Sequence, residues 1–408
     1  MKTIFLSMLT IAALASCTRQ DFIDPNDGTD PGGTGESMVV ELTVSSTQLT
    51  KADGAPDNAK DKAINDITVF GVNKGKNSVI SRQFFALTGS LESPNVQVQF
   101  KTTNQTDAIY VIANVGADLT GPQGALNLST VKALNNAMAS LIIPNPQGHG
   151  DKVAKQEEGK VLMSGYTSEV KLEAGSIVDK LATAEVQLNL IASKVILKEI
   201  TRISTATGVY GTNYKFVGAM MANVNTQAYY FADQYPLLEI PSYIGMIASP
   251  NDRPVIDKVF MSGAPADQQA GPGLEKASVL YQDLTTKAQE FESTKTLTNI
   301  AYWYVFENNE EASGKPTALQ LHYQWKSDQQ ETPQTDKYIS VVFGNGIYPS
   351  LVPGKAYSVS IQFDSNLTDQ DAPPGGDTPD EPTLEGEIGV TVTPAEWADG
   401  GSFDKPIK

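Results

Sequence analysis

The chain has 408 residues, and 40% of them are hydrophobic, enough to fill roughly two or three domain cores. Its 30 basic and 47 acidic side chains give a formal net charge of −17, which argues against nucleic acid as a partner, because phosphate contacts need clustered Lys and Arg. A single cysteine excludes internal disulfides and Cys-based zinc sites, and the two histidines have no spaced partners for a metal site or a catalytic triad. We therefore expect a globular protein that is not an enzyme and needs no metal or cofactor.

The N-terminus, MKTIFLSMLTIAALASC, resembles a bacterial lipoprotein signal. Lys2 precedes an apolar stretch, and small residues lead into Cys17. We predict that residues 1–16 are removed, that the Cys17 thiol receives the lipid, and that residues 17–37 form a flexible tether to the membrane. An ordinary signal peptide with an unmodified Cys17 is the alternative.

The first predicted strand lies in residues 38–49. The stretch SMVVELTVSSTQLT alternates apolar and polar side chains, which is the pattern of a half-buried strand. Its apolar face consists of Met38, Val40, Leu42 and Val44. An exposed-looking loop, TKADG, follows at once, and a trypsin-like protease would cut it between Lys51 and Ala52. Arg82 is a second basic candidate, but a cut there would break a predicted strand.

The middle of the first domain is predicted to contain strands and one helix. NVQVQF, residues 95–100, alternates in character, whereas AIYVIANVG, residues 108–116, is apolar on both faces, as in a central strand. A helix is predicted after Ser129 as the N-cap, with Pro144 as its stop. Apolar side chains recur in it at helical spacing: Val131, Leu134, Met138 and Leu141. We expect this helix to pack on the first sandwich.

A domain transition is predicted near Ala184, where a polar, Gly-containing stretch gives way to a long apolar run. Residues 38–183 and 184–365 would then form two β-sandwich domains of similar size. The second contains AYWYVF, apolar on both faces as in a central strand, and the alternating strands PTALQLHYQW and KAYSVSIQF. The pattern places His322 on the surface of one of these strands.

One more strand, LEGEIGVTVTPAEW, lies in the C-terminal segment 384–408, behind a linker rich in Pro and Gly, residues 366–383. A single strand cannot bury an apolar face by itself. The side chains predicted to enter a partner are Leu384, Ile388, Val390, Val392 and Trp397. The linker predicts a strand held at some distance from the body, where it would pair with a neighbouring molecule; the alternative is that it folds back on its own domain.

Several fragments, in their order along the chain, resemble the fimbrillins of the Bacteroidales, the subunits of the type V pilus. These fragments are LASC, QLTKADG followed by INDITVFGVN, AIYVIANVG, VLMSG, VQLNLIASKVILKEI, YWYVFENNEEASGKPTALQL, LVPGKAYSVSIQF and EIGVTVTPAEW. The resemblance covers nearly the whole chain. It implies a mainly β fold with two transthyretin-like, Greek-key β-sandwich domains, a short helix and an extended C-terminal donor strand.

The same resemblance implies a function. It implies export as an outer-membrane lipoprotein precursor, processing by a trypsin-like protease, and head-to-tail polymerisation with other copies and related fimbrial subunits. In such a fibre, a cut after Lys51 would free the strand 38–49, and the C-terminal strand of a neighbour would refill the groove. The fimbria on the cell surface would then adhere to host or bacterial surfaces.

Two alternatives from other functional classes stay open. A surface glycan-binding lipoprotein would present an exposed aromatic platform, but Trp303 and Trp325 lie in predicted strands and fit a core better. An accessory subunit at the tip or anchor of the same fimbria would lack the donor strand or the cut site. The chain has both patterns, which favours a stalk subunit.

Overall fold

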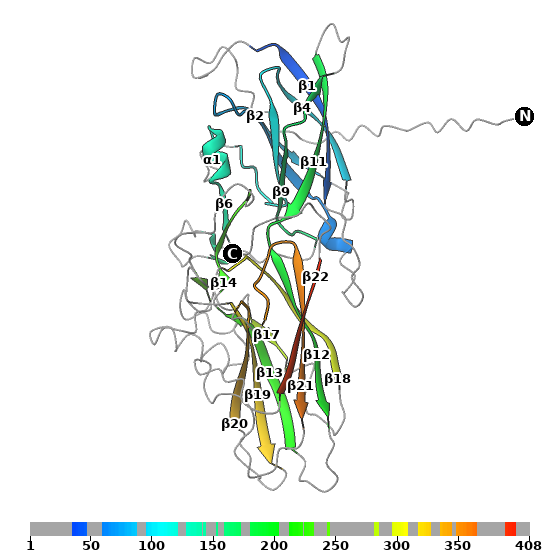
Figure 1. The fold of residues 1–408 in the computed structure, drawn as a ribbon, viewed down its shortest axis with the longest axis vertical. Helices are drawn as coiled ribbons and strands as arrows, with labels where there is room; N and C mark the ends of the chain where they lie inside the picture. The colour runs from blue at the N-terminus through cyan, green and yellow to red at the C-terminus, as the bar shows by residue number, and fades with distance from the viewer. Residues whose placement is uncertain are drawn as a thin grey trace, which may run out of the picture.

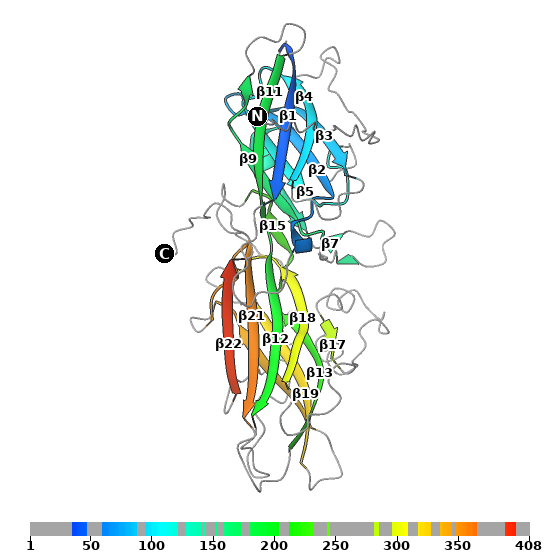
Figure 2. The same ribbon diagram turned by 90° about the vertical axis from the view of Figure 1, so that its right-hand side faces the viewer.

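The computed structural model describes most of the strands of the two predicted domains and the C-terminal strand. The described residues are 35–46, 59–87, 95–120, 128–140, 142–143, 152–153, 159–172, 180–203, 212–222, 224–231, 243–244, 281–284, 296–308, 317–327, 335–344, 348–364 and 388–396. They form two β-sandwiches that lie end to end along the long axis of the molecule (Figures 1 and 2). The expected mainly β architecture is confirmed.

The first layer of the N-terminal sandwich is built around β1 (Ser37–Ser46). On one side β1 pairs with β4 (Asn95–Thr103) in the antiparallel sense, and on the other it pairs with β11 (Lys180–Leu190) in parallel. The short β10 (Lys171–Leu172) lies on the far side of β11. β1 is therefore an inner strand, hydrogen-bonded along both of its sides (Figure 2).

The second layer contains four antiparallel strands in the order β3 (Ser78–Ala86), β2 (Asp66–Asn73), β5 (Ala108–Ala113) and β9 (Met163–Thr167). The last residues of β11, Asn189 and Leu190, pair with β9, so this long strand belongs to both layers. At the opposite side, Ser81 Oγ on β3 donates a hydrogen bond to Thr102 Oγ1 on β4 at 2.6 Å. The two layers are thus connected along both sides.

The C-terminal sandwich consists of two four-stranded sheets. The first has the order β18 (Thr296–Val305), β12 (Ser193–Ile203), β21 (Lys355–Asp364) and β22 (Ile388–Glu396). The second has the order β17 (Tyr281–Asp283), β13 (Thr212–Ala222), β19 (Ala318–Ser327) and β20 (Thr335–Val342). All of these pairs are antiparallel except β12 with β21, which is parallel.

Short elements lie around the two sandwiches. They are the 3-10 helix η1 (Ala59–Lys62), the helix α1 (Val131–Asn135), and three two-stranded sheets that pair β6 (Met138–Ser140) with β15 (Gln227–Tyr229), β7 (Ile142–Ile143) with β8 (Lys152–Val153), and β14 (Val224–Asn225) with β16 (Tyr243–Ile244). Because β6 precedes the crossing into the second sandwich and β15 follows it, their pairing ties the two halves of the chain together.

The predicted helix is shorter than expected and has a different N-cap. Thr130, not Ser129, caps it, because the Thr130 Oγ1 accepts a hydrogen bond from the Ala133 N–H at 3.0 Å. Met138, assigned to the helix by its spacing, begins β6 instead. The helical period was overridden by pairing with a strand far along the chain.

The predicted domain boundary near Ala184 falls inside β11. The chain crosses from one sandwich to the other at Ile191 and Ala192, between β11 and β12. The apolar run that was expected to open the second domain is the end of one inner strand followed directly by the start of another. It contains no polar break that would mark the crossing.

Burial confirms most of the strand predictions. β4 alternates buried and exposed residues in its NVQVQF stretch, and all residues of β5 are buried. Two predictions are wrong. AYWYVF contributes the second half of β18, which is at the end of its sheet and not in a central position, and Tyr302 is 42% exposed. His322 is 1% exposed, because β19 lies between two strands and its described residues are buried on both faces or nearly so.

Candidate functional site

The strand β1 fills a groove between β4 and β11. Its partners run in register from Met38 opposite Lys180 to Ser46 opposite Leu188 on the β11 side, and from Ser37 opposite Thr103 to Ser45 opposite Asn95 on the β4 side. The four apolar side chains predicted to form its inner face are at most 1% exposed: Met38, Val40, Leu42 and Val44. Sequence alternation therefore identified the buried face of this strand correctly.

The contribution of β1 to the N-terminal sandwich is large. Burial of four apolar side chains at about 1.5 to 3 kcal/mol each gives roughly 6 to 12 kcal/mol before entropy is counted. Hydrogen bonds on two sides add to this at ~0.5 to 1.5 kcal/mol each. One position fits less well, because Ser46 is 5% exposed and its Oγ has no hydrogen-bond partner among the described residues. Removing β1 would expose an apolar groove with unpaired backbone groups on both walls.

The chain that follows β1 passes through the predicted cut site. Lys51 and Ala52 lie outside the described residues. The C-terminal end of β1 and the helix η1, where the description resumes, both lie at the end of the first sandwich that faces the second (Figures 1 and 2). In the sequence, the predicted cut therefore lies between β1 and η1, which is at the domain junction.

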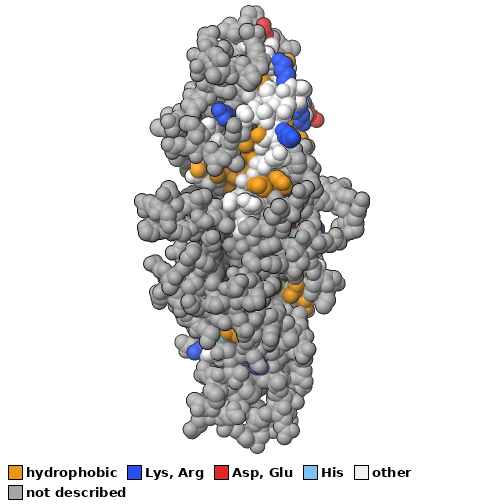
Figure 3. Space-filling model, turned by 90° about the vertical axis from the view of Figure 1, so that its left-hand side faces the viewer, with side chains coloured by type: hydrophobic (Ala, Val, Ile, Leu, Met, Phe, Trp, Pro, Cys, Tyr) orange, Lys and Arg blue, Asp and Glu red, His pale blue; other side chains and the backbone are white. Residues whose placement is uncertain are grey.

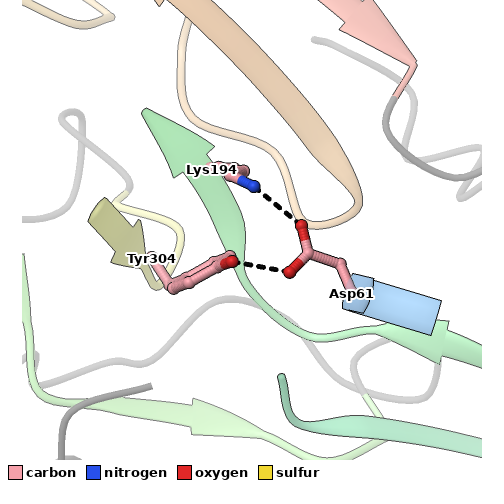
Figure 4. A network of polar contacts seen from close by, with 3 residues as sticks. All are labelled: Asp61, Lys194 and Tyr304. Atoms are coloured by element: carbon pink, nitrogen blue, oxygen red, sulfur yellow. Dashed lines mark hydrogen bonds and ion pairs between the residues drawn. The ribbon is translucent and has the colours of Figure 1, made fainter. Parts of the chain in front are cut away.

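A buried polar network lies at this junction (Figure 4). Asp61 on η1 accepts hydrogen bonds from two residues of the second sandwich: the Lys194 Nζ on β12 lies 2.8 Å from Oδ2, and the Tyr304 hydroxyl on β18 lies 2.6 Å from Oδ1. The side chains of Asp61 and Lys194 are 0% and 4% exposed. The Lys194 ammonium also lies 4.9 Å from the centre of the Tyr302 ring and 5.2 Å from that of Tyr304. No pattern in the sequence pointed to this network.

Residues just beyond η1 are fixed by a second set of polar contacts. The Asn65 N–H donates to Asn114 Oδ1 at 2.8 Å, and Asn114 Nδ2 donates to the carbonyl oxygens of Ala63 and Val161, each at 2.8 Å. Asn114 has a φ of 63°, a left-handed conformation that Asn tolerates better than most residues. These contacts hold the start of β2 against β5 and the approach to β9.

Asp66, at the start of β2, accepts hydrogen bonds from the backbone N–H groups of Val115 and Gly116, each at 3.0 Å. Burial raises the pKa of its carboxyl, and these two N–H groups act in the opposite direction by stabilising the charged form. The pKa of Tyr230 is raised to about 12, first by burial and then by the negative charge of Asp66. The two backbone donors hold the Asp66 carboxylate against the segment that follows β5.

The C-terminal strand is not held away from the body. β22 pairs with β21 along its whole length, from Phe363 opposite Ile388 to Lys355 opposite Glu396, and it is the last strand of its sheet. The expectation of a strand at a distance is thus wrong for this conformation, because β21 offers an edge that β22 can pair with on one side. Pro394, opposite Tyr357, suits such an edge, since Pro has no N–H to donate to a further strand. Leu384 and Trp397 lie outside the described residues, as do the side chains of Ile388, Val390 and Val392.

The described part of the chain contains no group of three or more His, Cys, Asp or Glu placed to hold a metal ion. Within it, no helix is long and apolar enough to cross a membrane. On the face shown in Figure 3, Lys and Arg side chains are spread over the first sandwich, and apolar side chains gather closer to the junction. Cys17, the predicted lipid site, lies outside the described residues.

The fold was compared with solved structures. It is similar to a candidate cell adhesion protein from Bacteroides eggerthii, with a TM-score of 0.58, 18% identity, and coverage of 90% of this chain and 98% of the other. It is also similar to a fimbrilin from Porphyromonas gingivalis, with a TM-score of 0.55, 13% identity, and coverage of 88% of this chain and 98% of the other. A third similar structure is a candidate cell adhesion protein from Parabacteroides distasonis, with a TM-score of 0.51, 15% identity, and coverage of 90% of this chain and 98% of the other.

The chain has a fimbrilin-like fold. The likeness extends over nearly the full length of the chain, as expected from the resemblance of the sequence fragments. At these low identities the likeness concerns the arrangement of the strands. No protein-family model matches the sequence, and no curated protein matches it either.

Proposed function

We propose that the protein is a structural subunit of a cell-surface fimbria that joins other copies head to tail by strand exchange. The observation that carries this proposal is the position of β1. It is an inner strand with an apolar face, it is the first strand among the described residues, and a predicted protease site follows it. The fold shared with a fimbrilin supports the same conclusion.

In the proposed sequence of events, lipid on Cys17 holds the precursor at the outer membrane, and a trypsin-like protease cuts between Lys51 and Ala52. The cut separates β1 from η1 and the rest of the chain, so β1 can leave with the lipidated N-terminus. The groove between β4 and β11 is then open to another strand.

The C-terminal strand of a neighbouring copy is the proposed occupant of this groove. Its apolar positions, Leu384, Ile388, Val390 and Val392, alternate as those of β1 do, and Trp397 follows them. β22 must first leave β21, to which it is paired on one side only, and in the groove it would gain partners on two sides. Because donor strand and groove lie in different parts of each subunit, the contact does not close and yields a filament. Such a fibre would also accept related fimbrial subunits and present surfaces for adhesion to host cells or other bacteria.

Burial bears on the glycan-binding alternative. Trp303 is 4% exposed, so it cannot stack on a sugar ring, and the side chain of Trp325 lies outside the described residues. The large apolar side chains exposed among the described residues are Leu172 and Tyr302. They lie in different sandwiches and form no common platform.

The proposal is tested by incubating the purified precursor with a trypsin-like protease. We expect a new N-terminus at Ala52 and filaments in electron micrographs. Lys51→Ala should leave a full-length, unpolymerised precursor under the same conditions. Normal filaments from this variant would place the processing site elsewhere, and correct cleavage without any filament would contradict strand exchange.

A further inference from the structure

We propose that Asp61, Lys194 and Tyr304 form a clamp that restricts processing to the chain before η1 and holds the new N-terminus at the domain junction after β1 has left. This inference rests on the proposed strand removal. It assigns a role to the buried network of Figure 4, which links the residues just beyond the cut to the second sandwich.

Asp61 of the clamp lies between two further basic residues after which a trypsin-like protease could cut the chain. Lys60 and Lys62 flank Asp61, and Lys60 is exposed. A cut after Lys62 would remove Asp61 together with β1 and so release the new N-terminus from the junction, and a cut after Lys60 would leave Asp61 itself as the new N-terminus. A protease needs several residues around the cut bond to be accessible and extended. η1 is not extended, since the Ala63 N–H donates to the Lys60 carbonyl at 3.1 Å in a helical turn, and Asp61 between the two lysines is buried.

To become a substrate, η1 must unwind, and Asp61 must leave its buried position. Both carboxylate oxygens of Asp61 are hydrogen-bonded, one to the Lys194 ammonium and one to the Tyr304 hydroxyl. Withdrawal of Asp61 would leave the buried Lys194 charge without its carboxylate partner. Such an opening is strongly disfavoured, and when opening and closing are fast, the rate of cleavage follows the population of the open form.

The clamp also connects the new N-terminus to a wall of the groove. Lys194 lies near the start of β12, and β12 follows β11, the parallel wall, after only Ile191 and Ala192. When β1 leaves, β11 loses the strand that pairs with it from Lys180 to Leu188. The contact from Asp61 to Lys194 is then one of the remaining restraints at the junction end of this wall.

The clamp is tested by limited trypsin digestion of the purified full-length precursor. The variants are made in a Lys51→Ala background, so that cleavage at Lys60 and Lys62 is read separately from the proposed processing cut. Mass spectrometry counts the products that begin at Asp61 or Ala63. We expect these products to be almost absent from Lys51→Ala alone.

Adding Tyr304→Phe removes one hydrogen bond but keeps the ring, and we expect it to raise cleavage at these two sites about tenfold. Asp61→Asn weakens both contacts, and we expect a larger increase. Tyr302→Phe is the matched control, because it changes a neighbouring Tyr of β18 and leaves both contacts to Asp61 in place; the rate should not change. Melting temperatures identify any variant that unfolds globally, and Tyr304→Phe is the variant with the smallest change.

Two results would overturn the inference. One is rapid cleavage after Lys60 or Lys62 in folded Lys51→Ala protein. The other is an unchanged rate when Tyr304→Phe or Asp61→Asn is added to that background in a folded protein. Failure of the wild-type protein to be cut after Lys51 would instead contradict the proposed processing step, and it would leave the comparison among the Lys51→Ala variants intact.

Discussion

If the C-terminal strand of a neighbour enters the groove as proposed, one proline restricts its register. In a strand paired on both sides, successive N–H groups are used by one neighbour and then the other, so a Pro within it leaves a carbonyl of a neighbour unpaired. β1 is paired on both sides from Met38 to Ser45. If the donor enters in the same direction as β1, Pro394 reaches Ser46 at the earliest. Val392, Val390 and Ile388 then replace Val44, Leu42 and Val40.

A shift that moves Pro394 two residues further into the groove is less favourable. It puts Pro394 at the place of Val44, which is 0% exposed, and leaves a buried carbonyl unpaired at a cost of about 1 to 3 kcal/mol. The predicted register instead places an apolar ring where the Ser46 hydroxyl has no described partner. We expect the predicted register to be favoured over this shift by roughly 10- to 100-fold.

Disulfides engineered between the donor strand and β4 test the predicted register. Thr43 lies opposite Gln97 of β4, and in the predicted register Thr391 of the neighbour takes its place. Gln97→Cys with Thr391→Cys should therefore link subunits covalently in filaments, because directly opposed Cβ atoms lie ~4.5 to 5.5 Å apart. Gln97→Cys with Thr393→Cys is the control, displaced by two residues to ~7 to 8 Å. The measurement is the ladder of linked subunits on a non-reducing gel. If the control pair gives linked subunits in the same or a higher yield than Gln97→Cys with Thr391→Cys, the predicted register is refuted.

Three further predictions concern single residues. Leu42→Ala should lower the unfolding free energy of the precursor by ~2 to 5 kcal/mol in urea titrations, since Leu42 is 1% exposed, whereas Glu41→Ala should change it by less than ~0.5 kcal/mol. Neither change should affect filaments, because β1 would have left them in the proposed assembly. The pKa of Asp66 is raised above its ordinary value of 3.8, so the stability it contributes is full below that pH and declines as pH rises through the raised pKa. The stability of the wild type relative to Asp66→Asn should thus fall with rising pH, and a flat difference would contradict the burial argument. Cys17→Ser protein should lose palmitate label in growing cells, and a retained label would place the lipid elsewhere.

Local alternation made most of the strands predictable. It identified the inner face of β1, the alternating β4 and the fully buried β5, because each pattern reports the environment of its own residues. Helical spacing was less informative: Met138 satisfies it but lies in β6, since pairing with β15 decides its conformation. The periodicity of a segment predicts the conformation of that segment alone and does not identify the strand with which it pairs.

Partners distant in the sequence could not be predicted. Asp61 is separated from Lys194 by 133 positions and from Tyr304 by 243, and no local signal relates them. The position of the domain crossing was missed for a similar reason, because Ile191 and Ala192 are as apolar as the strands on either side. The polar linker before β22 predicted that this strand is held away from the body of the protein. The linker does not, however, prevent β22 from pairing with β21 of the same domain.

The two sandwiches share an arrangement, but the connections of β1 and β12 differ in a way that would suit β1, rather than β12, to the proposed removal. Each strand lies between an antiparallel and a parallel partner: β1 between β4 and β11, and β12 between β18 and β21. β12, however, follows the groove wall β11 after two residues and carries Lys194, which is bonded to Asp61. It could not leave without pulling on β11 and breaking the junction, whereas β1 needs a single cut to be separated from everything that follows it. This asymmetry would give each subunit an opened groove in the first sandwich and a donor strand beyond the second, and it would make the filament grow with a defined direction.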